Sequence, residues 1–160
     1  MTTDQLMIDT ALASWRQAVA QASETFNSLT DDQFQREVAP ARIESFTSWA
    51  NLTAVNDAML TVLGLGDRLH PEVDAMFIKN PDKAIKELPT TANLEKYWAD
   101  VNQNVLHKME ALSPREWLQR HTTMTDEDLT KNPTRNRLNI LLSRARHVSY
   151  HLGQVALARN

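Results

Sequence analysis

The chain has 160 residues, a length that fits one domain spanning residues 1–160 around a single buried core. Its 17 basic and 20 acidic residues give a formal net charge of −3 without long blocks of like charge, which argues against nucleic acid or an anionic membrane as a partner. The absence of cysteine excludes disulfides, thiolate metal ligands and a cysteine nucleophile, so any thiol in the chemistry has to arrive with a substrate.

The N-terminal segment lacks a basic stretch followed by an apolar run, and no stretch approaches the roughly 18 apolar residues that span a bilayer. We therefore expect a cytoplasmic protein. From Thr3 onwards, apolar residues recur at alternating spacings of four and three, which predicts one face of a long amphipathic helix. These residues are Ile8, Leu12, Trp15, Val19, Ala22, Phe26 and Leu29.

The segment 30–42 breaks this period and ends in Ala39-Pro40-Ala41, which predicts a connection. A second amphipathic helix is expected to begin near Ile43 and to end at Gly64-Leu65-Gly66. Its apolar side consists of Ile43, Phe46, Trp49, Leu52, Met59, Leu60 and Leu63.

Residues 67–90 contain several prolines and few apolar positions, which indicates a long crossover with room for one short helix. A third helix is predicted from about Thr91, with an apolar stripe of Leu94, Trp98, Val101, Val105, Met109 and Leu112. The sequence Ser113-Pro114-Arg115-Glu116 has the pattern of a capping box, so a short helix should follow and present Trp117.

The last helix is expected to start after Asn132-Pro133 and to bury Leu138, Leu141, Leu142, Ala145, Val148, Leu152 and Ala156. No segment alternates polar and apolar residues for long enough to predict a strand. The fold class is therefore all-α. Long connections at 30–42, 67–90 and 113–132 favour a four-helix bundle with crossover connections over a simple up-down-up-down arrangement.

Two histidines of the last helix, His147 and His151, stand four residues apart, so their imidazoles project from successive turns of one face. They can bind one metal ion together, or they can be core-facing residues without a ligand. Nearby Tyr150 can place its hydroxyl at such a site or pack at its rim. Gly153 is costly inside a helix and suggests the close approach of a neighbouring helix or a ligand.

Segments along the chain together carry a family resemblance. In the last helix they are Arg135-Asn136-Arg137 and His147-Val148-Ser149-Tyr150-His151-Leu152-Gly153-Gln154. Upstream they are Ala39-Pro40-Ala41-Arg42, Trp49-Ala50-Asn51-Leu52-Thr53-Ala54-Val55, Asp57-Ala58-Met59-Leu60, Leu94-Glu95-Lys96-Tyr97-Trp98 and Trp117-Leu118-Gln119-Arg120-His121-Thr122. With these segments the chain resembles the DinB-like superfamily over nearly its whole length.

This resemblance implies an up-down-down-up bundle, a homodimer, and a nickel or zinc ion held by three histidines. His147 and His151 match two of them, whereas Asn51 stands where the family has the third. An asparagine carbonyl is a weak ligand for either metal, so the site is degenerate and the metal can be absent. Asn51 and Tyr150 are the expected cofactor-binding residues, and Asn56 is a further polar candidate for the same pocket.

Four other side chains can be considered as replacement ligands. Glu44 lies on a similar helical face to Asn51 but about 10 Å along the axis. His107 is expected to face solvent, while His121 and His70 are predicted to be loop residues. None of them is a convincing third ligand.

Two functions follow from the resemblance. The first is a metal-dependent thiol S-transferase type of enzyme, in which the metal lowers the pKa of a low-molecular-weight thiol that acts on a small molecule. The second is a non-catalytic, metal-free helical bundle that binds a ligand or serves as a stress-related dimer. DNA binding is disfavoured by the acidic balance and by the lack of a basic helix.

Overall fold

The computed structural model describes residues 1–35, 45–73 and 89–157, and this part of the chain contains helices and connecting turns but no strand. The expected all-α class is therefore confirmed. The predicted helix start near Ile43, the Ala39-Pro40-Ala41 connection, Glu44 and residues 74–88 of the crossover lie outside the described residues. No helix in the described ranges combines the length and the apolar character that crossing a bilayer requires.

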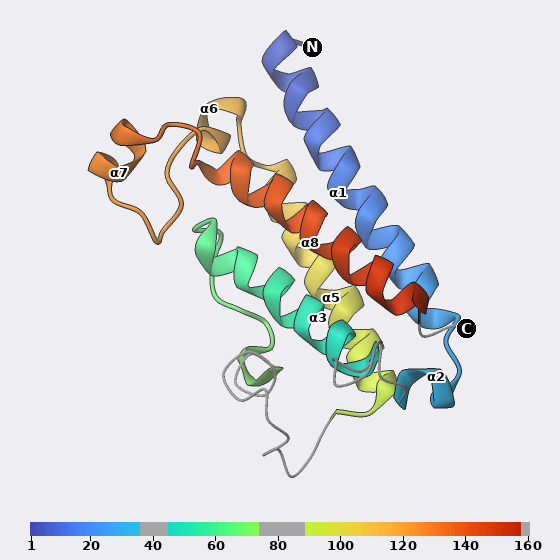
Figure 1. Cartoon of the computed structure of the whole chain (residues 1–160). Coiled ribbons are helices and arrows are strands. Elements are labelled where there is room, and N and C mark those ends of the chain that lie inside the picture. Colours follow the sequence, from blue (N-terminus) through green and yellow to red (C-terminus); the bar gives the residue numbers. More distant parts are fainter. Residues whose placement is uncertain (36–44, 74–88, 158–160) are drawn as a thin grey trace.

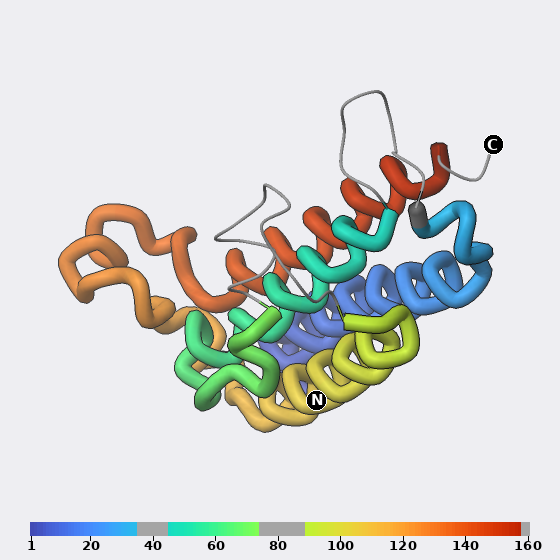
Figure 2. The backbone as a smooth tube through the Cα atoms, turned by 90° about the horizontal axis from the view of Figure 1, so that it is seen from below, coloured from blue at the N-terminus to red at the C-terminus, as the bar shows by residue number. Residues whose placement is uncertain are grey.

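The four longest helices of the described residues are α1 (Thr3–Asn27), α3 (Ser45–Val62), α5 (Thr91–Glu110) and α8 (Arg137–Leu157). Helix α1 packs along α8, and α3 packs along α5 and also against α8. Figures 1 and 2 show that α1 and α8 run in the same direction, whereas α3 and α5 run in the opposite direction. The helices within each pair are therefore parallel, and because α3 and α5 follow each other in the chain, their parallel arrangement requires the long connection expected from the sequence at 67–90.

Helix α3 is buried on nearly every side. None of its residues is fully exposed, and only Thr47, Asn51, Val55, Thr61 and Val62 are partly exposed. The prediction of an amphipathic second helix is thus wrong, because α3 packs against α5, α8 and the short helix α2 (Asp31–Gln35) at once. A helix buried all round carries small and apolar residues on all faces, so its sequence shows no clear polar side.

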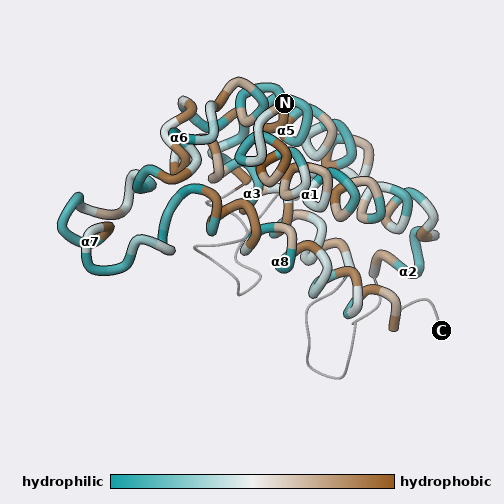
Figure 3. The backbone as a smooth tube through the Cα atoms, turned by 90° about the horizontal axis from the view of Figure 1, so that it is seen from above, coloured by the Kyte–Doolittle hydropathy of each residue, from teal (hydrophilic) through white to brown (hydrophobic). Residues whose placement is uncertain are grey.

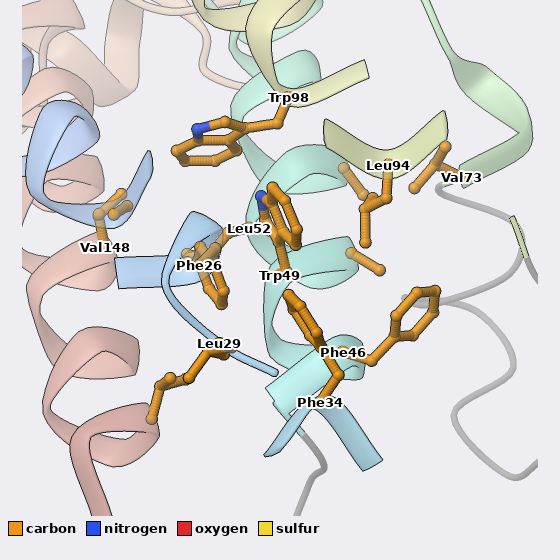
Figure 4. Close-up of a cluster of buried hydrophobic side chains, with 14 of the residues drawn as sticks. Phe26, Leu29, Phe34, Phe46, Trp49, Leu52, Val73, Leu94, Trp98 and Val148 are labelled. Carbon is orange, nitrogen blue, oxygen red and sulfur yellow. The ribbon is translucent and has the colours of Figure 1, made fainter. Parts of the chain in front are cut away.

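The short helix α2 lies within the segment that was expected to be a connection. Gln33 and Thr30 cap it reciprocally, since the Thr30 amide donates to Gln33 Oε1 at 3.0 Å. The helix delivers Phe34 to the core, where its ring stacks on Trp49 at a centroid distance of 5.6 Å. Phe26 stacks on the same indole at 4.7 Å and an interplanar angle of 1°, so three aromatic rings close this end of the molecule (Figure 4).

The opposite end is closed by a second cluster of buried side chains, drawn from α1, α3, α5, α8 and α6 (Pro114–Trp117). The Ser113 capping box predicted for α6 is present, and Trp117 is fully buried. The second cluster also includes Trp15, Met59, Met109 and Leu141. Burial of these large side chains removes apolar area worth about 25 cal/mol per Å² from water and holds the four helices together.

Helix α7 (Asp126–Lys131) was not anticipated by the sequence analysis. It begins with a second capping box, in which Thr125 and Asp128 satisfy each other's backbone amides, and none of its residues is buried. It projects away from the long helices and is mostly hydrophilic (Figures 1 and 3). Local capping, rather than core packing, therefore accounts for this helix.

Candidate functional site

Helix α8 buries Leu141, Ala145 and Val148 as expected, but the buried stripe continues through His151 and Val155 instead of Leu152 and Ala156. The buried residues are Leu141, Ala145, Val148, His151 and Val155, spaced by four, three, three and four. Leu142 and Ala156, expected to be buried, are exposed instead. His151 is consequently a core-facing residue with only 6% of its surface accessible, and His147 is partly buried beside it.

The two imidazoles face each other through their Nε2 atoms. These atoms are 3.2 Å apart, and the rings meet edge to face with centroids 4.6 Å apart and an interplanar angle of 87°. A hydrogen bond at this distance requires one ring to donate from Nε2 and the other to accept there. The two neutral rings therefore adopt opposite tautomers while they are bonded to each other.

Burial keeps both rings uncharged. It lowers the pKa of His147, and the nearby Arg144 guanidinium lowers it further. The pKa of His151 falls to about 4, mainly through burial and secondly through His147, while its contact with Gln154 acts in the opposite direction. Both imidazoles are thus neutral at pH 7, which is the form that ligates a metal.

The pair has the geometry of half a metal site. Two nitrogens each about 2.1 Å from one ion lie about 3.4 Å apart when the ligands are tetrahedral, close to the observed separation. No group of three histidine, aspartate or glutamate side chains able to hold a metal occurs among the described residues. The two Nδ1 atoms are buried and make no hydrogen bond, although metal-bound histidines usually donate from that second nitrogen.

The predicted third position, Asn51, lies on the partly exposed flank of α3 that it shares with Thr47 and Val55. Within the described ranges its side chain makes no hydrogen bond to either histidine. Asn56 belongs to a separate buried polar pair, since its Nδ2 donates to Asn102 Oδ1 on α5 at 2.7 Å. The polar pocket expected to join Asn51 and Asn56 is therefore not formed by direct contact.

Tyr150 lies at the rim, which is one of its two predicted roles. Its side chain is 62% exposed, its hydroxyl accepts from Gln154 Nε2 at 3.1 Å, and its ring meets His151 edge to face at 5.5 Å. It also lines a groove of about 710 Å³ between α1 and α8, to which Ser14 and Ala18 contribute. Neither histidine lines this groove, so Tyr150 faces a different space from the Nε2 atoms.

The remaining histidines lie apart from the pair. His70 stacks on Tyr97 at 4.0 Å, and His107 is exposed, as predicted. His121 lies in the loop between α6 and α7, as predicted, but it is only 6% exposed, with its ring nitrogen 2.8 Å from Thr123 Oγ1. Burial and Arg135 both lower its pKa.

The roles of two polar residues, Asp57 and Arg144, were not predicted from the sequence. The buried carboxylate of Asp57 accepts from the backbone amides of Leu69 and His70 at 2.8 and 2.9 Å, and so ties the chain after α3 back onto that helix. Arg144 lies one turn before His147, and its Nε is shielded from solvent without a partner. The burial of Asp57 could have been predicted, because an aspartate inside an apolar helix is unusual. Arg144 gave no such indication, because arginine on a helix normally lies on a solvated face.

The close approach expected at Gly153 is not observed. A Cβ atom built there meets no described atom within 4 Å, because this residue lies on the exposed side of α8. The glycine therefore has no packing role within the part of the chain that the structure describes.

Comparison with known proteins adds no assignment: no protein-family model matches the chain, and no curated protein matches it. The residues and their geometry are therefore the basis for a proposed function.

Proposed function

We propose that this protein is a DinB-like four-helix bundle of up-down-down-up topology that uses His147 and His151 to hold a zinc or nickel ion. The parallel pairing of α1 with α8 and of α3 with α5 supports the topology (Figure 1). The observation that carries the metal proposal is the 3.2 Å separation of the Nε2 atoms of two neutral imidazoles on one helix. Both lone pairs can be directed at one ion once the shared hydrogen bond opens.

We propose thiol S-transfer to a small molecule as the reaction class. The bound cation would supply one thing, a lower pKa for a thiol ligated to it. The chain contains no cysteine, so that thiol belongs to a cosubstrate. With two strong protein ligands, the remaining positions are open to water, the thiol or the weak carbonyl of Asn51.

A second candidate function is a metal-free bundle that binds a small ligand. The observation in its favour is the same Nε2 contact, because two neutral imidazoles joined by a hydrogen bond form a stable arrangement without an ion. The lack of a third histidine or carboxylate among the described residues favours it as well. Metal content distinguishes the two candidates.

A homodimer is also proposed, formed through the outer face of α8. Large apolar side chains are exposed on this face at Leu142, Tyr150 and Leu157, with 43%, 62% and 64% of their surface accessible. Gly153 lies among them with open space above it, which permits close approach of a second helix. Light scattering coupled to size exclusion tests this, and a monomeric mass at micromolar concentration would contradict it.

The test of the metal proposal is elemental analysis of protein purified without a histidine tag, beside a variant with both His147→Ala and His151→Ala. We expect about one zinc or nickel ion per chain in the wild type and loss of that ion in the variant. Asn51→His should raise the affinity for zinc if Asn51 faces the pair. A wild type that neither contains nor takes up metal would leave the metal-free candidate.

A further inference from the structure

Arg144 shares one flank of α8 with the histidine pair. Successive residues of a helix are about 100° apart, so positions 144, 147 and 151 fall within a stripe about 60° wide. His147 is about 4.5 Å along the axis from Arg144 and His151 about 10 Å. All three side chains are at least partly buried, and each has a ring or guanidinium nitrogen that is shielded from solvent without a partner.

The guanidinium has no counter-ion in the described part of the chain. Its Nε is shielded from solvent and unbonded, and burial lowers the pKa of Arg144 with no acidic group offsetting that effect. By contrast, Arg120 donates to Asp126 Oδ1 at 2.8 Å, and Arg16 pairs with Glu110 across helices. Partly buried cations are normally paired, so Arg144 is an exception that needs a reason.

Arg137 is the other arginine of α8 whose Nε is shielded and unbonded. The position of this side chain explains why its charge is tolerated there. Its Nη2 lies 3.5 Å from the place where a Cβ on Gly64 would be, next to the C-terminal end of α3. The carbonyl end of a helix favours a cation. Arg144 lies mid-helix, where the macrodipole offers no such compensation.

We infer that Arg144 binds the carboxylate of the small molecule that the histidine pair handles, an inference that rests on the proposed function. A guanidinium presents a planar fork of N–H donors that matches the two oxygens of a carboxylate. Two neutral imidazoles and a cation on one stripe suit a short molecule with a metal-binding atom at one end and an acid at the other. A carboxylic acid that carries a thiol has this chemistry.

The test follows the Nε–H resonance of Arg144 in proton–nitrogen correlation NMR spectra of the full chain, assigned by its disappearance in Arg144→Met. The probes are β-mercaptopropionate and its neutral amide, β-mercaptopropionamide, each titrated with one equivalent of zinc and, separately, with a chelator. The matched control is Arg146→Met, two residues away on the exposed side of α8. Probe binding to the Met variants is followed by the backbone amides of α8.

We expect the acid to bind wild type and Arg146→Met at least about tenfold more tightly than the amide, and this preference to vanish in Arg144→Met. Arg144→Met should also unfold at a higher temperature than wild type, because it removes an unpaired, partly buried charge, whereas a purely structural arginine would give a lower unfolding temperature. Equal binding of the acid to wild type and Arg144→Met overturns the inference. So does a wild type that shows no preference for the acid up to about 10 mM.

The titrations with zinc and with chelator distinguish a failure of this inference from a failure of the metal proposal. If the preference for the acid persists equally in chelator, Arg144 binds the carboxylate and the metal proposal fails. If zinc binds at one ion per chain but the acid is not preferred, the metal proposal stands and the role of Arg144 is wrong.

Discussion

Two groups of shielded polar side chains in this molecule differ in how far they are hydrogen-bonded. Asp57 on α3 accepts from two backbone amides, and the Asn56 amide donates to Asn102, which in turn donates to the Trp98 carbonyl at 2.7 Å, so these side chains are bonded although the Asn56 Oδ1 atom has no partner. On the flank of α8, shielded nitrogens of Arg144, His147 and His151 have no partner.

This difference predicts that the two groups respond differently to mutation. A satisfied buried polar group contributes about 1 kcal/mol or more and costs heavily when its partner is removed. An unsatisfied one costs stability in the free protein, so its removal should be cheap or favourable. Single shielded atoms without a partner also occur in the core, such as Ser45 Oγ and Ser48 Oγ, and the three on α8 differ from them by lying together on a flank that includes a cation. The bonded region should therefore respond to mutation through stability, and the α8 flank through binding.

The largest expected effect is on the bonded side, at Asp57. Asp57→Ala leaves the amides of Leu69 and His70 without their acceptor and should lower the free energy of unfolding by about 3 kcal/mol. Urea denaturation measures this. The control is Asp100→Ala, which removes an exposed ion pair with Lys96 and should cost less than about 0.5 kcal/mol. Similar losses in the two variants would show that the Asp57 bonds are unimportant.

The Asn56–Asn102 pair sharpens the comparison through a double-mutant cycle. Asn102→Leu strands the buried amide of Asn56 and should cost about 2 kcal/mol, whereas the double variant Asn56→Leu/Asn102→Leu should recover most of that loss because no polar atom is left unbonded. Strictly additive losses would contradict this expectation.

On the α8 flank, His151→Leu replaces a buried and largely unsatisfied ring by an apolar side chain. The free energy of unfolding should change by less than about 1 kcal/mol, since the lost hydrogen bond to His147 is offset by apolar burial. Zinc uptake should nevertheless be lost. A destabilisation as large as that of Asp57→Ala would place His151 among the structural polar residues.

Gly153 tests the exposed side of the same helix. Gly153→Ala should stabilise the monomer by up to about 1 kcal/mol, because alanine is the better helix former and the new methyl group meets no described atom. Thermal unfolding at low protein concentration measures this. If the proposed dimer uses this face, the same variant should weaken association, which sedimentation at increasing concentration detects.

The smallest effect concerns the capping box of α6. Hydrogen bonds from the Ser113 hydroxyl and backbone amide hold the pKa of Glu116 below its ordinary value of 4.5. Because the folded-state pKa is the lower one, this carboxylate stabilises the fold above about pH 4.5 and loses that contribution as the pH falls through its folded value. Melting temperatures of wild type and Glu116→Gln should therefore converge in acid, and a gap independent of pH would contradict this.

Local sequence signals anticipated most of the long helices and the Ser113 box, because capping chemistry and apolar spacing act within a few residues of each other. They missed α2 because Phe34 is fixed by stacking on Trp49, and its burial there depends on the tertiary structure. The all-round burial of α3 was missed for the same reason: a helix in contact with several partners has no polar face to reveal it.

The candidate site was predictable only where it depends on one helix. The i, i+4 spacing brought His147 and His151 together, as their 3.2 Å contact shows. Whether Asn51 faces that pair depends on how α3 packs on α8, which helical periodicity does not determine. Arg144 gave no signal, because an arginine without a carboxylate partner cannot be recognised until its surroundings are known.

The most direct test of the central claim is to observe the imidazole nitrogens of the tag-free, metal-free protein before and after one equivalent of zinc. Without metal, nitrogen NMR should show one ring protonated at Nε2 and the other at Nδ1, since the rings share a hydrogen bond. With zinc, both Nε2 resonances should shift to metal-bound values and both protons should lie on Nδ1. Unchanged spectra at one equivalent of zinc would contradict the claim that this pair is reserved for a metal.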